Sequence, residues 1–364
     1  KIMSTIELQN LTKAFGELIA VNNVSLKVEE NEVLCLLGPS GCGKTTTLRM
    51  VAGLEVATSG DIFIANKNVN NLDTRDRNLA MAFQFYALYP SLTVAENLAN
   101  PLHAENLSTE EVRKKIFEIA DILQLRDIIN RKPHQLAEGE KQRVAVGRAI
   151  IRDPECFLFD EPLSRLDVQL REQMRGQIKE VLSNLKKATV IVTHDQLEAL
   201  TMATKIAVMR DGFIEQISSP HDIFAKPNNT FVAGFIGTPQ MNILDCKISN
   251  ANSSIVKINT LGQEIEIDFE SQLDLNMNDD HYLGIRPRSF EIVNDNSLDS
   301  FSGQVDLIEN MGAEVLIHIK INESTFRSVQ NKSHQIKIGE NINLKPKKGQ
   351  VHLFNKEGKV IRNE

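Results

Sequence analysis

The feature that most constrains this chain is an eight-residue stretch that matches the phosphate-binding pattern G-x-x-x-x-G-K-[ST] at every fixed position: Gly38-Pro39-Ser40-Gly41-Cys42-Gly43-Lys44-Thr45. An apolar run at 33–37, long enough for a buried strand, precedes it, and residues 46–52 are typical of the first turns of a helix. Glycine lets the backbone wrap closely around phosphate groups, and the N-terminus of a helix favours an anion. The alternative, a glycine-rich turn with a chance lysine, leaves the strand and the helix unexplained. The sequence therefore predicts a nucleotide site.

Two side chains of this phosphate loop have expected roles in that site. Lys44 is expected to reach the terminal phosphates, and the Thr45 hydroxyl to hold a magnesium ion that bridges them. Thr46, the next residue, completes the predicted set of nucleotide contacts.

Length, charge and cysteine content limit the remaining possibilities. A chain of 364 residues with 41% hydrophobic content is long enough for two or three packed domains. The net charge of -7 argues against a general nucleic-acid binder, which normally presents a basic surface to phosphates. We find no apolar run near the about 18 residues that span a bilayer and no signal-peptide pattern. Four cysteines without metal-type spacing predict a reducing, cytoplasmic environment: Cys35, Cys42, Cys156 and Cys246.

Polar side chains follow three further apolar runs, each where a predicted strand ends. The strands and the residues that follow them are 79–83 with Gln84, 156–159 with Asp160 and Glu161, and 189–192 with His194. Because ligands of open α/β sheets bind where parallel strands end, we expect these side chains at one edge. Beside a phosphate loop, Asp160 is expected to coordinate magnesium and Glu161 to polarise an attacking water, the alternative being a solvated turn. Gln84 is expected to ligate the metal, to position the water or merely to begin a loop. His194 is expected either to belong to the site or to be a loop histidine whose hydrogen bonds are satisfied locally.

Aromatic residues mark two other places. Residues 6–36 alternate strand-like runs with turns and predict a small antiparallel sheet beside the strand of the phosphate loop. Phe15 lies at a turn within it, where an aromatic side chain is more often core than ligand, although its face can stack on a base. The segment Tyr86-Ala87-Leu88-Tyr89-Pro90 concentrates aromatic residues in a chain that has only 5% of them, which predicts a contact surface.

The middle of the chain, about 90–152, predicts a helical insert. Ser108 and Glu111 form a capping box, and apolar residues then recur at spacings of three and four. Pro133 is expected to break this helical stretch before another helix begins within 136–143.

After about Gln240 the pattern changes to short alternating strands with Asn/Asp/Gly-rich turns. Strands at such spacing without a long helix need closure to bury their faces, which predicts an all-β module of barrel type. The predicted strands are 243–248, 254–258, 264–269, 282–285, 304–308, 314–321 and 336–338.

Taken together, these motifs resemble the ATP-binding subunit of an ABC transporter, of the importer type that serves sugar uptake and carries a C-terminal regulatory β-domain. The resemblance covers nearly the whole chain and is most specific over about 5–238, where six separated motifs follow in the family's order. It implies an α/β P-loop ATPase domain at 3–239, with a helical subdomain at about 90–152, and an OB-like all-β domain at 240–364. Two further segments are similar to the family's accessory domain: Met241-Asn242 and Gly284-Ile285-Arg286-Pro287.

The resemblance also implies roles for individual residues, with ATP and Mg²⁺ as cofactors. Phe15 matches the aromatic that stacks on adenine, and Gln84 the residue that links magnesium to the membrane partner. Asp160 matches the magnesium-associated acid, which places Thr45, Gln84 and Asp160 at the metal. The catalytic set is then the base Glu161, the γ-phosphate sensor His194, and Gln84. The segment Ser164-Arg165-Leu166-Asp167 matches a loop that crosses the interface of an ATPase dimer.

The resemblance fails at 136–140. The family's signature there is Leu-Ser-Gly-Gly-Gln, which places a serine hydroxyl and backbone N–H groups on the γ-phosphate bound by the opposite subunit. In this chain Leu136 and Gly139 remain, whereas Ala137, Glu138 and Glu140 replace the serine, the first glycine and the glutamine. A carboxylate at a helix N-terminus satisfies the preference for an anion with the protein's own charge and repels phosphate. The alternative is that both glutamates are favourable helix-start residues in a working site.

These replacements predict an asymmetric pair, in which a different chain with an intact signature completes one competent site. The resemblance implies permease subunits that contact the Gln84–Pro90 region, an external solute-binding protein that acts indirectly, and a peripheral place at the cytoplasmic face of the inner membrane. Sugar or a related polyol is the expected cargo, and no direct contact with nucleic acid is expected. Three alternatives stay open: a homodimer importing a polyamine or an inorganic anion, a soluble ABC ATPase acting on nucleic acid or ribosomes, and a mainly regulatory subunit that docks a signalling protein through 240–364.

Overall fold

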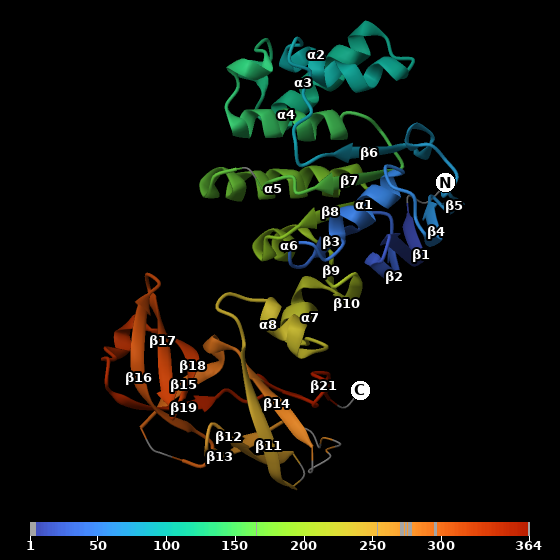
Figure 1. Cartoon of the computed structure of the whole chain (residues 1–364). Helices are drawn as coiled ribbons and strands as arrows, with labels where there is room; N and C mark the ends of the chain where they lie inside the picture. Colours follow the sequence, from blue (N-terminus) through green and yellow to red (C-terminus); the bar gives the residue numbers. More distant parts are fainter. Residues whose placement is uncertain are drawn as a thin grey trace. The chain divides into compact units, whose positions relative to one another are not determined.

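A computed structural model describes residues 5–164, 166–252, 254–269, 273, 275, 279–294 and 297–362. The chain divides into two compact units, Lys1–Asp222 and Ile223–Glu364, and each is described here by itself (Figure 1). The domain boundary that the sequence predicts at 239/240 stays a prediction.

The first unit is built on a six-stranded sheet of order β10-β9-β3-β8-β7-β6. Its strands are β3 (Val33–Leu37), β6 (Leu79–Ala82), β7 (Cys156–Asp160), β8 (Ala188–Thr193), β9 (Lys205–Arg210) and β10 (Phe213–Ser218). β3, β6, β7, β8 and β9 run parallel, and only β10 is antiparallel to its neighbour. Every residue of β3, β7 and β8 is buried, because the sheet is covered on both faces and its central strands need continuous apolar runs.

A smaller antiparallel sheet of order β2-β1-β4-β5 confirms the sheet expected from residues 6–36. Its strands are β1 (Ile6–Phe15), β2 (Leu18–Val28), β4 (Ser59–Ile64) and β5 (Lys67–Asn68). The predicted short runs 18–21 and 24–28 are one strand, since β2 stays paired with β1 across several register shifts. This long hairpin carries Phe15 at its tip.

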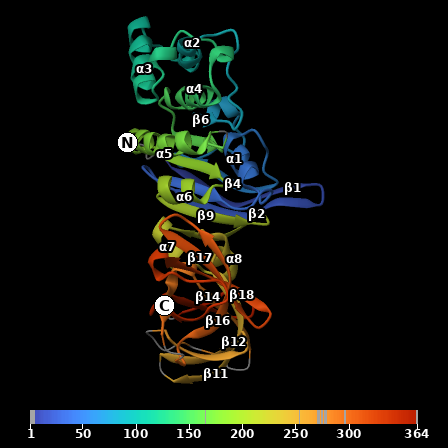
Figure 2. The same ribbon diagram turned by 90° about the vertical axis from the view of Figure 1, so that its left-hand side faces the viewer.

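The helices of the first unit flank these sheets. They are α1 (Lys44–Ala52), α2 (Val94–Ala99), α3 (Thr109–Ile122), α4 (Glu138–Ile150), α5 (Val168–Leu185) and α6 (Gln196–Met202), with 3₁₀ turns η1 (Thr74–Arg77), η2 (Asn100–Ala104), η3 (Arg126–Ile128) and η4 (Pro133–Gln135). Figure 2 shows α2, α3 and α4 gathered at one end of the unit, beyond β6, as expected of a helical insert. The capping box of Ser108 and Glu111 at the start of α3 is confirmed.

Pro133 does not end this helix, contrary to the sequence prediction. α3 stops at Ile122, and the amide of Leu123 is satisfied by the carbonyl of Ile119. Apolar residues after it, at Leu125 and Ile128, are buried, so packing rather than proline turns the chain away. Pro133 instead begins η4, where proline suits a first helical position.

The second unit is β-rich, as predicted, and its strands lie in two sheets. One sheet has the order β13-β12-β11-β14-β20-β21 and the other β15-β19-β16-β17-β18 (Figure 1). Strand bounds are β11 (Asn242–Asn252), β12 (Ile255–Thr260), β13 (Gln263–Asp268), β14 (Asp280–Ile285), β15 (Phe290–Val293), β16 (Phe301–Asn310), β17 (Glu314–Ile321), β18 (Ser324–Asn331), β19 (Asn341–Pro346), β20 (Val351–Phe354) and β21 (Val360–Ile361). Both sheets contribute to one hydrophobic core, in which the rings of Phe290, Phe301 and Phe326 pack with centroids 5.4–6.0 Å apart.

One predicted strand of this unit, 336–338, is wrong. The segment is a loop that follows the 3₁₀ turn η6 (Lys332–His334), and Ile338 is exposed. Gly339 then adopts a φ of 84°, so the chain turns before β19 begins at Asn341.

Short helices precede the β-rich part of the second unit. α7 (Pro220–Ala225) crosses the division between the units, α8 (Thr230–Phe235) lies wholly in the second, and η5 (Pro287–Ser289) follows β14. The buried Arg286 fastens α7 and α8: its guanidinium donates to the carbonyls of Phe224 (2.6 Å) and Ile236 (2.7 Å) and stacks over the Phe224 ring. Burial lowers the pKa of Arg286 to about 10. The Gly-Ile-Arg-Pro segment thus anchors these helices to β14.

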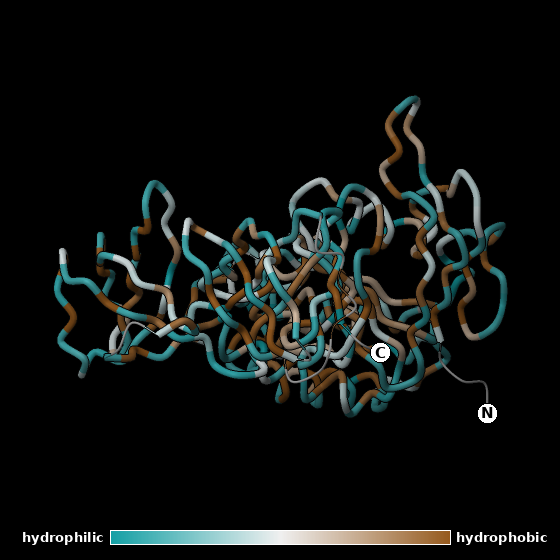
Figure 3. The backbone as a smooth tube through the Cα atoms, turned by 90° about the horizontal axis from the view of Figure 1, so that it is seen from below, coloured by the Kyte–Doolittle hydropathy of each residue, from teal (hydrophilic) through white to brown (hydrophobic). Residues whose placement is uncertain are grey.

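Within the described part of the chain, no helix combines the length and the apolar character needed to cross a membrane. Along the backbone, hydrophobic and hydrophilic stretches alternate at short intervals (Figure 3).

Candidate nucleotide site

The phosphate loop occupies the turn between β3 and α1, as the sequence predicts. Two of its glycines are required by close contacts: a Cβ on Gly38 would lie 2.2 Å from the Met209 carbonyl oxygen, and one on Gly43 2.4 Å from that of Ala20. Gly43 is also the N-cap of α1 with a φ of 103°, so the first turn of this helix starts without a side-chain cap. The N–H groups of that turn therefore remain available for an anion. Pro39, Ser40 and Gly41 form the exposed outer part of the loop, Cys42 is buried beneath it, and Thr46 is half-buried.

Lys44 is folded into the loop that it belongs to. Its ammonium donates to the carbonyl oxygens of Gly38 and Pro39, both at 2.8 Å, and lies 3.6 Å from the Cys42 sulfur. The side chain is buried. Because an ammonium has three donors and carbonyl oxygens carry only partial charge, a phosphate that enters the loop offers Lys44 a stronger partner.

Thr45 and Asp160 bring two oxygen donors together. The Thr45 hydroxyl donates at 3.0 Å to Oδ1 of Asp160, which is the last residue of β7. Burial raises the pKa of Asp160, which the hydrogen bond from Thr45 partly offsets. A hydroxyl and a carboxylate at this spacing fit Mg²⁺, which takes hard oxygen ligands. A cation there would also relieve the cost of the buried carboxylate.

Glu161 is held from both sides. Nε2 of Gln84 donates to its Oε2 at 2.6 Å, and Nδ1 of His194 lies 3.1 Å from its Oε1. The three residues follow β6, β7 and β8, which are adjacent and parallel, so the prediction that these strand ends meet at one edge is confirmed. Glu161 has a φ of 50°, a left-handed conformation that is costly for a non-glycine residue. Its amide donates to the Val192 carbonyl, which fixes the strained turn.

Phe15 lies on the hairpin of β1 and β2, 47% exposed, with the Lys13 ammonium 4.7 Å from its ring centroid. The same hairpin contacts the phosphate loop at Ala20, against which Gly43 packs. The structure therefore places an accessible aromatic on the element beside the loop, and its stacking on a base stays a prediction.

The signature segment 136–140 starts α4, with Ala137 as its N-cap. Oε2 of Glu140 accepts a hydrogen bond from the Ala137 amide at 2.8 Å, and Glu138 pairs with Lys141 at 2.7 Å. Leu136 is buried, and Gly139 packs so closely on Leu170 of α5 that a Cβ would lie 2.1 Å from it. The Glu140 carboxylate thus satisfies the amide of the N-cap residue, and two carboxylates stand in the first turn of the helix.

Asp167 is the N-cap of α5, where its carboxylate accepts from the Leu170 amide at 3.0 Å. Ser164 donates its hydroxyl to the Glu161 carbonyl, and Leu166 is buried. Arg165, the fourth member of the predicted interface loop, lies outside the described residues.

The segment after Gln84 exposes aromatic side chains. Phe85 is 67% exposed and Tyr89 44%, and the Arg148 guanidinium lies 4.9 Å from the Tyr89 ring while donating to the Ala87 carbonyl. The side chain of the buried Asn97 accepts a hydrogen bond from the Tyr89 amide and donates one to the Tyr89 carbonyl, which holds the segment in place. A hollow of about 200 Å³ lies here between β6 and α4. The segment predicted as a contact surface is therefore a loop with exposed aromatic side chains, and hydrogen bonds from Asn97 and Arg148 hold its backbone.

Three residues near His194 were missed by sequence reasoning: Arg171, Asp195 and Glu198. Asp195 is the N-cap of α6, and its Oδ2 lies 3.2 Å from Nη1 of Arg171. The Asp-x-x-Glu spacing of Asp195 and Glu198 is a recognisable helix-start pattern, but Arg171 has no local signal that links it to them.

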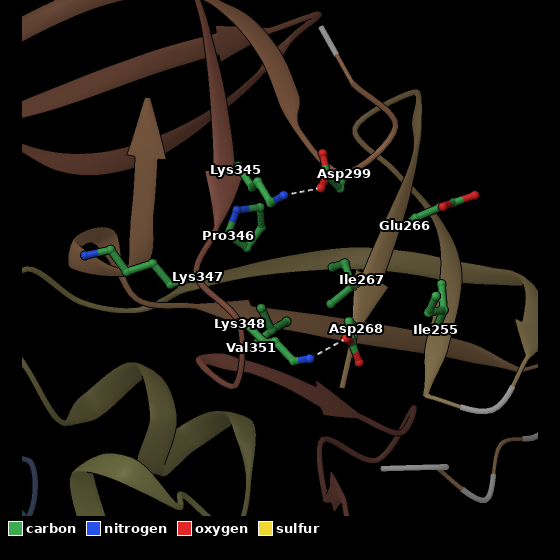
Figure 4. Close-up of a pocket in the computed structure, with 10 residues that line it drawn as sticks. All are labelled: Ile255, Glu266, Ile267, Asp268, Asp299, Lys345, Pro346, Lys347, Lys348 and Val351. Atoms are coloured by element: carbon green, nitrogen blue, oxygen red, sulfur yellow. Dashed lines mark ion pairs between the residues drawn. The ribbon is translucent and has the colours of Figure 1, made fainter. Parts of the chain in front are cut away.

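The second unit contains a separate cavity of about 280 Å³ (Figure 4). Its lining includes the apolar Ile267 and Val351 and two ion pairs, Lys345 with Asp299 and Lys348 with Asp268.

Comparison with known proteins agrees with this geometry. The family model described as ABC transporter matches residues 21–164, and the model described as TOBE domain matches residues 283–354. The chain is 39% identical to the trehalose/maltose import ATP-binding protein MalK of Thermococcus litoralis, with 99% of this chain and 100% of the relative covered. It is 42% identical to the sn-glycerol-3-phosphate import ATP-binding protein UgpC 1 of Rhizobium etli, with 97% of each covered. It is 40% identical to the xylose/arabinose import ATP-binding protein XacJ of Haloferax volcanii, with 99% of this chain and 96% of the relative covered.

A solved structure shares the first unit's fold. It is a dimeric ATP-binding cassette in a post-hydrolysis state, bound to ADP and Pi, and it is 33% identical with a TM-score of 0.54. The match covers 59% of this chain and 98% of that one. With a phosphate loop, a carboxylate held at the strand edge and relatives that match along nearly their whole length, the chain belongs to the ABC transporter ATP-binding proteins and is an ATPase of the solute-importing kind with a C-terminal TOBE domain.

Proposed function

We propose that the chain hydrolyses ATP to drive the import of a sugar, a related polyol or a sugar-like phosphate. The observation that carries the catalytic part is Glu161, whose two carboxylate oxygens are held by Gln84 and His194 at the same edge as the phosphate loop. The cargo class is supported by relatives whose names specify trehalose/maltose, xylose/arabinose and sn-glycerol-3-phosphate.

In this proposal the phosphate loop binds the phosphates of ATP, and the hairpin of β1 and β2 contacts the adenine. The α1 amides and the Lys44 ammonium contact the β- and γ-phosphates, for which Lys44 exchanges its bonds to the Gly38 and Pro39 carbonyls. The exposed ring of Phe15 stacks on adenine.

Glu161 acts as the general base. A water that replaces one of its present partners transfers a proton to the carboxylate as the water oxygen bonds to the γ-phosphorus. The bond from that phosphorus to the β–γ bridging oxygen breaks, and ADP and phosphate result. His194 donates to a γ-phosphate oxygen, and Gln84 orients the water. Thr45, Asp160 and Gln84 would hold Mg²⁺, which when bound supplies positive charge to the β- and γ-phosphate oxygens.

The aromatic loop is proposed as the contact with permease subunits. Residues 84–90 begin at Gln84, which touches the base Glu161, and continue to the exposed Phe85 and Tyr89. A partner seated on these rings therefore lies one short segment from the reacting centre. In this proposal the chain lies at the cytoplasmic face of the membrane, and an external solute-binding protein acts through the permease.

We further propose that the ATPase pair is asymmetric. Glu138 and Glu140 place two carboxylates in the first turn of α4, so this chain offers a weakened signature to a neighbour's nucleotide. A partner chain with an intact signature completes the site built on this chain's phosphate loop. The functional division at 239/240, with a regulatory role for 240–364, is part of the same proposal.

The test begins with the membrane proteins that purify with the chain. The complex is reconstituted in vesicles with its solute-binding protein, and ATP-driven uptake of labelled maltose, xylose and glycerol 3-phosphate is measured. Uptake of one of them supports the cargo class. Uptake only of a polyamine or an inorganic anion would overturn the cargo assignment while leaving the ATPase assignment intact.

The pairing has its own measurement. The chain purified alone is expected to turn over ATP slowly and without cooperativity, and the complex is expected to contain a second ATPase chain. Vigorous, cooperative hydrolysis by the chain alone contradicts the asymmetric pair and favours a homodimer.

A further inference from the structure

Arg171 joins the two segments that flank the reacting centre. It lies in the first turn of α5, and its Nη2 donates to the carbonyl of Leu166 at 3.0 Å and approaches that of Ser164 at 3.5 Å. Its Nη1 donates to Oδ2 of Asp195 at 3.2 Å. One planar group therefore connects the loop that follows Glu161 to the residue that follows His194.

Asp195 transmits this contact to the backbone on which His194 sits. Its second oxygen, Oδ1, accepts from the amides of Leu197 (2.8 Å) and Glu198 (3.1 Å) and so fixes the start of α6. With one oxygen on the helix and the other on Arg171, the carboxylate can rotate little without losing a bond.

Thr193 fixes the other side of His194. Its hydroxyl accepts from the Asp195 amide at 3.0 Å and donates to Oε2 of Glu198 at 2.7 Å. The residues before and after His194 are thus tied into one network, whereas the imidazole itself is exposed and meets Glu161.

The positive charge of Arg171 also offsets the two carboxylates of this network, those of Asp195 and Glu198. Glu198 is only 3% exposed, and burial raises its pKa, with the nearby Asp195 carboxylate acting in the same direction. Nε of Arg171 lies 3.9 Å from Oε1 of Glu198, so one guanidinium faces both carboxylates. Arg175 stabilises the ionised form of Glu198 as well, but Arg171 is the cation that also contacts Asp195. Without Arg171, Asp195 and Glu198 repel each other beside His194.

We propose that Arg171 is a positioning residue that fixes the backbone of His194 beside Glu161 and ties it to the carbonyls of Ser164 and Leu166. The proposal rests on the proposed function, in which Glu161 is the base and His194 contacts the γ-phosphate. The alternative is that Arg171 merely fastens α5 to α6. The chain offers a matched control for that alternative: Lys179, two turns further along α5, donates to the Thr201 carbonyl of α6 at 2.7 Å.

The experiment compares Arg171→Gln with Lys179→Gln in the full importer complex. We expect kcat for ATP hydrolysis to fall about tenfold or more in R171Q, with KM for ATP changed less than about twofold, because positioning acts on the transition state. K179Q is expected to keep both values within about twofold of the unmodified protein. Arg171→Lys should be intermediate, since a single ammonium cannot span Asp195 and the loop carbonyls together.

A second readout isolates the action through His194. The ring resonances of His194, assigned by comparison with His194→Ala, should shift in R171Q and stay in place in K179Q. In the H194A background, R171Q should cause little further loss of turnover, since residues that act as a unit are not additive. Melting curves check that each variant is folded, and R171K carries the test if R171Q unfolds.

The outcomes separate the two claims. If the unmodified complex hydrolyses ATP and H194A does not, but R171Q matches K179Q in turnover and in the His194 resonances, the positioning role of Arg171 is wrong and the proposed function stands. If H194A retains full turnover, the proposed roles of the site fail, and the role of Arg171 fails with them.

Discussion

Nδ1 of His194 lies 3.1 Å from Oε1 of Glu161, at the tips of the neighbouring strands β8 and β7. The other oxygen of Glu161 is taken by Gln84. Each carboxylate oxygen of the expected base therefore already has one protein partner and keeps a second lone pair that a water can use. In the proposed mechanism ATP draws these partners away from Glu161, because the γ-phosphate is a better acceptor for the imidazole and the metal would be a partner for the amide.

The first prediction concerns this carboxylate. Glu161→Gln keeps the shape and one acceptor oxygen but cannot take a proton from water, so turnover in the complex should fall by about 100-fold or more. Binding of ATP should persist, because the phosphate loop is unchanged. Nucleotide affinity by fluorescence titration and phosphate release together check this.

A matched control for Glu161→Gln is Glu172→Gln, an exposed change on α5 that also removes one carboxylate. E172Q should hydrolyse ATP at the unmodified rate. Normal turnover in E161Q would remove Glu161 from the role of base.

The second prediction concerns Asp160, a ligand of the proposed metal site, and its effect on stability. Burial raises the pKa of Asp160, so its ionised form destabilises the nucleotide-free fold. Asp160→Asn keeps an acceptor for the Thr45 hydroxyl and removes the charge, so D160N should melt at a higher temperature than the unmodified chain at pH 7.5 while losing Mg²⁺-dependent turnover.

The sign of this effect sets its pH window. A carboxyl with a raised pKa costs stability as pH rises from its ordinary pKa, near 3.8, through the folded value. The advantage of D160N should therefore be full at neutral pH and shrink toward pH 4. The exposed Asp127→Asn variant controls for loss of a charge. A constant difference at all pH values, or a less stable D160N, would show that ionisation of Asp160 is not the cause.

Much of the site could be predicted because it depends on local patterns and on one rule of topology. The phosphate loop is contiguous in the sequence, and parallel strands bring Gln84, Glu161 and His194 to one edge however far apart they are along the chain.

Other features depend on packing that no local pattern records. Arg171 and Asp195 are 24 positions apart and meet only because α5 and α6 pack side by side. Arg286 holds α7 and α8 through carbonyls that lie 62 and 50 positions before it in the sequence. Contacts over such separations leave no local sequence pattern from which these short helices could be predicted. The end of α3 at Ile122 is similarly set by the burial of Leu123 and Leu125 rather than by Pro133.

The third prediction concerns acid stability of the second unit. His352 lies on β20. Its burial, and then the positive charges of Arg286 and Arg362, lower its pKa to about 4. The unfolded chain takes up this proton near pH 6.5 and the folded chain does not, so stability is lost as pH falls from about 6.5 toward 4. At pH 5 the loss should be about 2 kcal/mol.

His352→Gln removes the titration, so the drop in stability between pH 7.5 and pH 5 should be smaller in H352Q than in the unmodified chain. Urea unfolding of the full chain, followed by far-UV circular dichroism, measures it. The exposed His334→Gln change is the control and should leave the drop as it is. Equal drops in H352Q and the unmodified chain would contradict a neutral His352.

The last prediction concerns the carboxylate that caps α4. In the triple variant Ala137→Ser, Glu138→Gly and Glu140→Gln, the serine hydroxyl adds an acceptor for the N–H groups of the first turn, the amide side chain at 140 keeps an acceptor for the N–H of residue 137, and two negative charges leave the helix start. If Glu140 repels the neighbour's nucleotide, ATP turnover by the chain alone should rise severalfold, and the gain should be smaller in A137S, which keeps both glutamates. Glu110→Gln, at the first turn of α3, removes a comparable helix-start charge away from the signature and should change nothing. Unchanged turnover in the triple variant would mean that the self-capped helix start is compatible with a working site, and the asymmetric pair would lose its physical basis.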